Sequence, residues 1–137
     1  MSMLTTLQIS SSAMNAQMVR MNTTASNLAN IDVVGSSEAE AYKAKKPIFK
    51  TVMETYTNND FQASVSVSGI HVTERANSKR YDPQNPAANG DGYVFMSNVN
   101  SIEEMVDMTN ASRSYQTNVE VMNATKKMMM STLQLGR

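Results

Sequence analysis

Residues 101–137 read SIEEMVDMTNASRSYQTNVEVMNATKKMMMSTLQLGR, with no proline and with glycine only at Gly136. Alternating steps of three and four residues meet a nearly continuous apolar stripe, the pattern of a helix that packs against another helix. The stripe consists of Met105, Met108, Ser112, Tyr115, Val119, Met122, Lys126, Met129 and Leu133. A long amphipathic helix is therefore predicted here, with Ser112 and Lys126 as polar interruptions of its seam.

Both ends of this helix carry recognisable signals. Ser101 and Glu104 have the spacing of a capping box, in which the hydroxyl and the carboxylate satisfy free backbone amides of the first turn. Lys126 and Lys127 lie near the negative end of the helix dipole, and Gly136 stands where a C-terminal cap is expected. The helix is thus predicted to begin at Ser101.

A second helix is predicted over residues 1–30, which contain a single charged residue, Arg20, and neither proline nor glycine. The same spacing selects Leu4, Leu7, Ser11, Met14, Met18, Met21, Ala25 and Leu28. A helix of about 26 residues is about 39 Å long and cannot bury this stripe against itself. The predicted fold is therefore mainly α, with the two terminal helices forming a coiled-coil-like pair.

The N-terminal helix is polar around its stripe but almost uncharged. The residues concerned are Thr5, Thr6, Gln8, Ser10, Ser12, Asn15, Gln17, Asn22, Thr23, Ser26, Asn27 and Asn30. Two explanations are open: an exposed face that is short of charge, or cover by neighbouring chains. Because desolvating a charge is costly whereas amides and hydroxyls can be satisfied by hydrogen bonds, cover by neighbours is favoured.

The predicted assembly interface consists of the apolar members of both stripes. They are Leu4, Leu7, Met14, Met18, Met21, Leu28, Met105, Met108, Tyr115, Val119, Met122, Met129 and Leu133. Methionine, of which the chain has 13, is an adaptable filler of contacts between non-identical surfaces. The alternative is simple core packing, in which the surface that buries the methionines belongs to the same chain. Substitution of Leu7 or Met122 by aspartate is expected to block assembly.

Residues 31–100 hold all three prolines and four of the five glycines, and are predicted to form a central insertion of short β-strands and loops. The candidate strands are 48–53, 63–68, 70–73 and 93–95, with Gly69 separating the second from the third. Residues 82–92 are rich in turn formers. Residues 32–46 have no periodicity and are a candidate mobile segment. The domain division is a terminal helical domain, 1–30 with 101–137, and the insertion 31–100.

Composition excludes several classes of protein. The chain has 137 residues, 12 basic and 12 acidic side chains, no cysteine and one histidine. This length does not allow a barrel enzyme, the balanced charge argues against nucleic-acid binding, and thiol chemistry is absent. The N-terminus has no basic and apolar leader, and no apolar run reaches 18 residues, so neither a cleaved signal peptide nor a membrane span is expected.

Two features superficially suggest a chemical site. Residues 89–92 read NGDG, but they lack the ligand spacing and the bidentate glutamate of a calcium loop, so a turn is favoured. His71 has no partner constellation for catalysis and is interpreted as a surface or half-buried histidine. No catalytic residue, metal site or cofactor is predicted, and an enzyme is not expected.

The N-terminal helix ends in Ala25-Ser26-Asn27-Leu28-Ala29-Asn30, which resembles the signature of bacterial flagellar rod and hook proteins. Within that family, further blocks resemble the proximal rod proteins; they lie at 81–83, 85–87, 91–94, 98–100, 103–108, 111–116 and 118–121. The departures lie in the connecting segment, where Ile31-Asp32 and residues 36–41 differ from the usual pattern.

The resemblance implies a structural subunit of the flagellar basal body, built into the periplasmic rod that transmits torque and encloses the export channel. It implies export through the flagellar type III apparatus without signal cleavage, and helical assembly with copies of itself and with FlgB, FlgF, FlgG and FliE. No nucleic acid or small-molecule substrate is implied. The alternative is a type III secreted helical binding module or adaptor.

Two further hypotheses concern the helices themselves. Because the helices are far apart in sequence, both are expected to be partly disordered until several chains bury their seams together. Asn27 and Asn30 are expected to end the first helix through side-chain hydrogen bonds to the backbone, with contact to another subunit as the alternative role.

Overall fold

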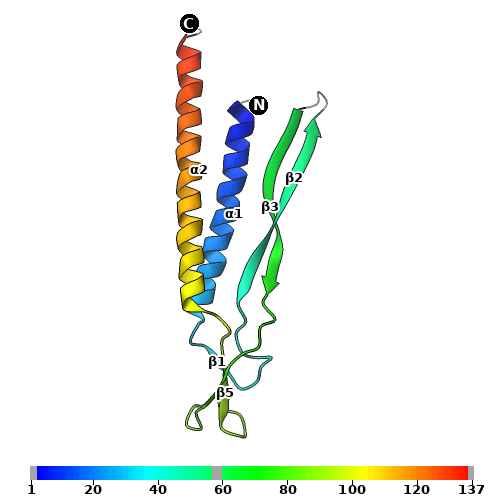
Figure 1. Ribbon diagram of the computed structural model, residues 1–137, viewed down its shortest axis with the longest axis vertical. Helices are drawn as coiled ribbons and strands as arrows, with labels where there is room; N and C mark the ends of the chain where they lie inside the picture. The colour runs from blue at the N-terminus through cyan, green and yellow to red at the C-terminus, as the bar shows by residue number, and fades with distance from the viewer. Residues whose placement is uncertain (1–2, 57–59, 136–137) are drawn as a thin grey trace.

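The computed structural model describes residues 3–56 and 60–135. It contains two long helices, a two-stranded ribbon and a small three-stranded sheet (Figure 1). The elements are α1 Met3–Ala29, β1 Val34–Gly35, β2 Lys45–Tyr56, β3 Asp60–Val72, β4 Lys79–Tyr81, β5 Tyr93–Met96 and α2 Ser101–Leu135. The predicted fold class, two long terminal helices around a central β region, is confirmed. Gly136, the expected cap, lies outside the described residues.

α1 is the central element of the molecule. It contacts α2 on one side and both β2 and β3 on another, so the helix lies between its helical partner and the ribbon (Figure 1). The helices are antiparallel, and α2 extends past the first residues of α1. The small sheet lies at the opposite end of the molecule from the N-terminus of α1.

Small and polar side chains, not the methionines, form the most buried part of the helical layer. The buried residues are Ser10, Ala16, Thr23, Thr24 and Asn27 on α1, and Glu104, Ala111 and Thr125 on α2. Short side chains allow two helices to approach closely, whereas methionines fit at the flanks of such a contact. The predicted seam of α2 is therefore wrong by one residue at three positions: Glu104, Ala111 and Thr125 are buried in place of Met105, Ser112 and Lys126.

α2 begins at Ser101 as predicted, but its cap is Asn100. The Asn100 Oδ1 atom accepts hydrogen bonds from the amides of Ile102 at 3.0 Å and Glu103 at 3.5 Å. An asparagine in this position satisfies amides that have no partner inside the helix. The predicted capping box is wrong, because Glu104 is instead buried against α1.

The ribbon is longer than the short strands expected from the sequence. β2 has 12 residues and β3 has 13, paired antiparallel from Lys45 opposite Val72 to the far end. The predicted segments 63–68 and 70–73 are one strand, not two. Ile48 pairs with Gly69 and Phe49 with Val67, which leaves Ser68 as the extra residue of a β-bulge. Gly69 therefore marks a bulge instead of a strand end.

The three-stranded sheet has the order β1-β5-β4, so β5 is the central strand. Its Val94 is fully buried. The predicted turn region 82–92 precedes β5 and returns the chain from β4. Gly92 has a φ of 78°, a backbone conformation that favours glycine, and a Cβ there would lie 2.9 Å from the Tyr81 ring. The Tyr81 and Tyr93 rings pack edge to face at 5.2 Å across β4 and β5.

Residues 32–46, which have no periodicity in the sequence, are packed in the structure. They include β1 and the start of β2, and Ala41 and Ala44 between them are buried. Gly35 lies so close to residue 41 that an added Cβ would be 2.7 Å from the Ala41 amide nitrogen. This segment is the connection through which α1, the sheet and the ribbon meet.

Candidate functional site

The first turns of α2 present an apolar surface to the solvent. Ile102 is 69% exposed, and with Met105 and Val106, each about half exposed, it lines a shallow groove of about 410 Å³. Thr109, Asn110 and Arg113 complete the groove. Large apolar side chains grouped in this way usually mark a contact with another protein.

A second apolar surface lies at the other end of α2. Met128, Met130, Leu133 and Leu135 are all exposed there, the last two by 69% and 88%. On α1, whose N-terminus lies at the same end of the molecule, Leu4 is also exposed (Figure 1). The four α2 side chains follow Thr125, the last buried residue of α2, and α2 extends beyond the first residues of α1.

The predicted interface residues fall into two groups. Leu4, Met18, Met105 and Leu133 are exposed. The remaining nine are half-buried within this chain: Leu7, Met14, Met21, Leu28, Met108, Tyr115, Val119, Met122 and Met129. Those nine contribute to the chain's own packing, so only their exposed portions are free for a neighbour.

The predicted interface left out six exposed apolar residues of α2. They are Ile102, Val106, Val121, Met128, Met130 and Leu135. The signal was present as the i, i+3, i+4 spacing of Ile102, Met105 and Val106, which places them on one side of a helix. Of these three residues the heptad pattern selected only Met105.

The uncharged character of α1 has an explanation within the chain. The ribbon lies along α1, where the Val65 amide donates a hydrogen bond to Ser12 Oγ at 3.2 Å. The Arg20 guanidinium, the one charge of α1, stacks on the Phe49 ring at 4.6 Å. A helix covered by α2 and by the ribbon leaves little surface for charged side chains, so packing within the chain accounts for part of the pattern.

Asn27 connects the end of α1 to the ribbon. Its side chain is fully buried, and its Oδ1 accepts hydrogen bonds from the Lys45 amide and the Tyr42 hydroxyl, both at 3.0 Å. Its Nδ2 donates to the Lys45 carbonyl at 2.8 Å. The expected helix-ending role is thus wrong for Asn27, whose side chain binds another segment instead of the end of its own helix.

Asn30 does what the sequence predicts. Its Nδ2 donates to the Ser26 carbonyl at 2.7 Å, and its amide bonds to the carbonyls of Ser26 and Asn27 at the last turn. The two asparagines of the signature at residues 25–30 therefore have different roles. The Asn30 side chain bonds to the last turn of α1, whereas the Asn27 side chain joins α1 to β2. The sequence could not separate them, because both lie at the same helix terminus.

Two more asparagines extend this junction. Asn98 Oδ1 accepts from the Ala44 amide at 2.7 Å, and its Nδ2 donates to the carbonyls of Arg75 at 2.7 Å and Thr73 at 3.3 Å. Asn77 Nδ2 donates to the carbonyls of Met96 at 2.7 Å and Tyr42 at 3.1 Å. Together with Asn27 and Tyr42 they form what we call the asparagine junction.

An ion-pair group joins β2 to the start of α2. Lys46 Nζ lies 2.6 Å from Glu103 Oε1 and 3.8 Å from Asp107 Oδ2, and Arg75 lies 3.8 Å from Glu103. The hydrogen bond to Glu103 raises the pKa of Lys46, and the same bond lowers the pKa of Glu103. Both side chains are about 40% exposed, so the pair contributes little to stability.

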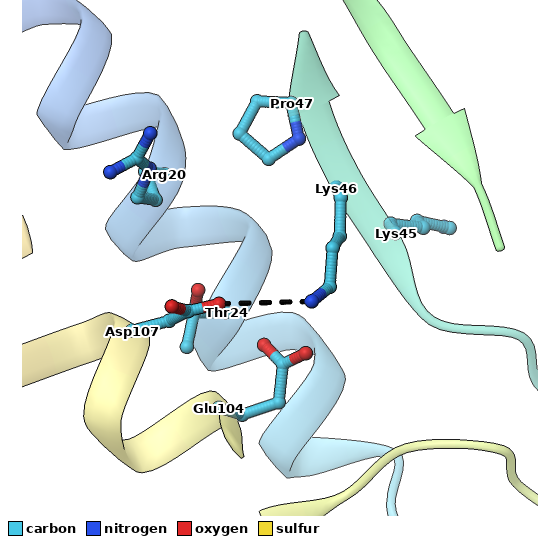
Figure 2. Close-up of a pocket in the computed structure, with 7 residues that line it drawn as sticks. All are labelled: Arg20, Thr24, Lys45, Lys46, Pro47, Glu104 and Asp107. Carbon is cyan, nitrogen blue, oxygen red and sulfur yellow. Dashed lines mark ion pairs between the residues drawn. The ribbon is translucent and has the colours of Figure 1, made fainter.

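A small polar cavity of about 210 Å³ lies beside this group (Figure 2). Its lining mixes cations and carboxylates: Arg20, Thr24, Lys45, Lys46, Pro47, Glu104 and Asp107. Figure 2 shows the Lys46 side chain reaching from β2 toward Asp107 and Glu104 of α2. Because the opposite charges lie side by side, the cavity offers no surface of one sign for an ionic ligand.

The features that superficially suggested chemistry are structural. Asn89 Oδ1 accepts from the amides of Asp91 and Tyr93, which makes residues 89–93 a turn, as favoured. His71 is exposed on β3 opposite Lys46, consistent with a surface histidine. Over residues 3–56 and 60–135 no group of three metal-ligating side chains is found, and neither helix is apolar enough to cross a membrane.

The two helical regions match known families. Residues 7–35 match the family of flagella basal body rod proteins, and residues 91–135 match the C-terminal region of flagellar basal body rod FlgEFG proteins. The chain is 39% identical to the flagellar basal-body rod protein FlgC of Salmonella typhimurium, with 100% of both chains aligned. It is 40% identical to FlgC of Escherichia coli O157:H7 over 100% of both, and 35% identical to FlgC of Bacillus subtilis over 96% of both.

Proposed function

The chain belongs to the FlgC family of flagellar basal-body rod proteins and is a structural subunit of the periplasmic proximal rod; we propose that its exposed apolar surfaces join it to neighbouring axial subunits. Its function is therefore assembly, not catalysis. The full-length similarity to rod proteins favours this function over a secreted binding module or adaptor.

The observation that carries the proposal is the exposed apolar surface at both ends of α2. At the first turns, Ile102, Met105 and Val106 form one surface, and Leu133 and Leu135 belong to the other. Each large apolar side chain that becomes buried contributes on the order of 1.5–3 kcal/mol. Contacts at both ends of a long helix suit a subunit with neighbours above and below it.

The neighbours belong to the same axial structure. Copies of this chain, FlgB, FlgF, FlgG and FliE are the proposed partners, and the half-buried methionines along the seams would adapt to such non-identical surfaces. In this arrangement the subunits form a drive shaft that transmits torque and encloses the export channel. The subunit reaches the rod through the type III export apparatus.

Two exposed residues test the proposal without altering the chain's own core. Met105→Asp and Leu133→Asp, each as the sole copy of the protein, are expected to abolish swimming and to remove the rod from purified basal bodies, because a carboxylate would be buried in a dry contact. Both variants should retain the helical circular dichroism of the unmodified protein. Normal motility of both variants would contradict the proposed surfaces.

Two controls separate assembly from folding. Gln116→Asp places the same charge at an exposed position of α2 between the two apolar surfaces, and should leave swimming unchanged. Met122→Asp introduces a charge at a half-buried position, so it is expected to lower the stability of the isolated chain as well as block assembly. Loss of motility with Gln116→Asp would show that any added charge on α2 is harmful.

A further inference from the structure

The Asn27 side chain takes the place of a neighbouring β-strand. Its amide offers one acceptor and one donor, and both are used on a single residue: Oδ1 accepts from the Lys45 amide at 3.0 Å and Nδ2 donates to the Lys45 carbonyl at 2.8 Å. A strand neighbour satisfies a residue in the same way, by exchanging both bonds. The first residue of β2 is thus paired to a helix.

The geometry requires asparagine at this position. Aspartate has the same shape but cannot donate to the Lys45 carbonyl, and alanine would leave both backbone groups without these partners in a buried site. The Tyr42 hydroxyl donates a third bond to Asn27 Oδ1 at 3.0 Å, which fixes the orientation of the amide. No other role of the residue is needed to explain its complete burial.

The other end of the ribbon base is held by Asn98. Its Oδ1 binds the Ala44 amide immediately before β2, and its Nδ2 binds the Thr73 carbonyl immediately after β3. The Thr73 amide in turn bonds to the Ala44 carbonyl at 2.8 Å. Both strands are therefore tied, at the point where they leave the rest of the molecule, to residues outside the ribbon.

We propose that Asn27 and Asn98 are positioning residues that lock the direction of the β2–β3 ribbon relative to the helix pair. A two-stranded ribbon is marginally stable by itself. Contacts with α1 hold it along its length, and the two asparagines hold its base. With them, the ribbon and the helices move as one body, which a subunit that carries mechanical load requires. The coupling itself concerns the isolated chain and does not depend on the rod function.

The absence of cysteine makes a direct measurement possible. Spin labels are attached to Thr51→Cys on β2 and Gln116→Cys on α2, both exposed sites, and the distance distribution is measured by pulsed electron paramagnetic resonance. The unmodified junction should give one narrow distribution. Asn27→Ala and Asn98→Ala should each broaden it, while the helical circular dichroism is retained.

Asn30→Ala is the matched control, since it removes a side-chain bond in the same signature without touching the ribbon. It should leave the distribution narrow. If Asn27→Ala and Asn98→Ala also leave it narrow, packing along α1 alone holds the ribbon and the proposal is overturned. Broadening by Asn30→Ala to the same extent would also overturn it, because general loosening of the helix end would then be the cause.

Hydrogen exchange of the unmodified protein tests the proposal even if a variant does not fold. The amides of Ala44 and Lys45, both bonded to asparagine side chains, should exchange slowly. Fast exchange at both amides would contradict the proposed role of Asn27 and Asn98. In folded Asn27→Ala, exchange at Lys45 should rise by roughly tenfold, with unchanged protection in the middle of α1 and α2. A uniform rise throughout the chain would indicate lost stability instead of lost positioning.

Discussion

Gly35 illustrates how much a single residue can constrain the connecting segment. An added Cβ would lie 2.7 Å from the Ala41 amide nitrogen, closer than real Cβ atoms approach, and 3.0 Å from the Ala41 Cα, which is also a tight contact. The contact is with backbone, which cannot rotate away as a flexible side chain can. The turn at residues 36–40 therefore closes tightly only because position 35 has no side chain.

Gly35→Ala is accordingly expected to destabilise the chain by about 1–3 kcal/mol, as an overpacked buried site does. Gly69→Ala is the matched control, because a Cβ at Gly69 meets nothing within 4 Å, and it should change the free energy of unfolding by less than about 1 kcal/mol. Urea unfolding followed by circular dichroism measures both. Equal stability of the two variants would contradict the close approach.

The helix and the ribbon each depend on contacts made at their ends. α2 is capped by Asn100 from outside its first turn, and the base of β2 is joined to that same turn by Lys46 and Glu103. The cap joins residues that are close in the sequence, whereas the ion pair joins residues that are far apart in it. Different measurements therefore test the two contacts.

For the cap, Asn100→Ala should cost about 1 kcal/mol of stability, because two amides of the first turn lose their acceptor. Ser101→Ala should cost less than about half of that, since the cap hydrogen bonds come from Asn100. Thermal unfolding distinguishes the two. A larger cost at Ser101 than at Asn100 would restore the capping box predicted from the sequence.

For the ion pair, pH is the appropriate variable. The pKa of Glu103 is lower in the folded chain than its ordinary value of 4.5, so its contribution is present above about pH 4.5 and is lost as the pH falls through the folded pKa. The pKa of Lys46 is raised above 10.5, so its contribution is present below that pH and is lost as the pH rises through the raised value.

Lys46→Met should therefore lower the free energy of unfolding at pH 7 by less than about 1 kcal/mol. It should also reduce the stability that the chain loses between about pH 5 and about pH 3, because Glu103 then has no Lys46 partner to lose. Lys50→Met, at an exposed lysine of the same strand, should retain the acid dependence of the unmodified protein. Urea titrations across this range measure the difference. An unchanged acid dependence in Lys46→Met would show that the pair contributes nothing measurable.

In the whole molecule, the two terminal helices differ in how fully they are covered. α1 lies between α2 and the ribbon, and its Arg20 is half-buried over Phe49 (Figure 1). The last turns of α2 extend beyond α1 (Figure 1). Lys126 and Lys127 directly follow Thr125, the last buried residue of α2, and both are exposed. The hypothesis of disorder before assembly therefore applies more strongly to the end of α2 than to α1.

Limited digestion of the purified chain with trypsin tests this difference. Cleavage at Lys126 and Lys127 is expected well before cleavage at Arg20, because proteolysis follows local opening and the end of α2 has few contacts to break. Mass spectrometry of the early fragments identifies the sites. Cleavage at Arg20 as early as at Lys126 would support disorder of both helices in the isolated subunit.

The sequence predicted the long helices, the start of α2 at Ser101 and the central β region, because helical periodicity and turn-forming residues are local signals. It also supplied the ASNLAN signature and hence the family. It identified the buried face of α2 only in part: Met108, Tyr115 and Met122 of the predicted stripe are half-buried, but Glu104 is buried where Met105 was expected. Glu104 and Met105 are adjacent in the sequence, and the periodicity does not choose between them. A difference of one residue is decided by which helix surfaces fit closely.

What the sequence by itself determined is the type and extent of the main elements, together with the protein family. The tertiary structure alone decided the role of Asn27, the cap at Asn100 and the cover of α1 by the ribbon. The reason is physical: periodicity and capping preference depend on residues a few positions apart, whereas these contacts join segments distant in the chain or select among neighbouring caps. Their hydrogen-bond partners exist only once the chain has folded.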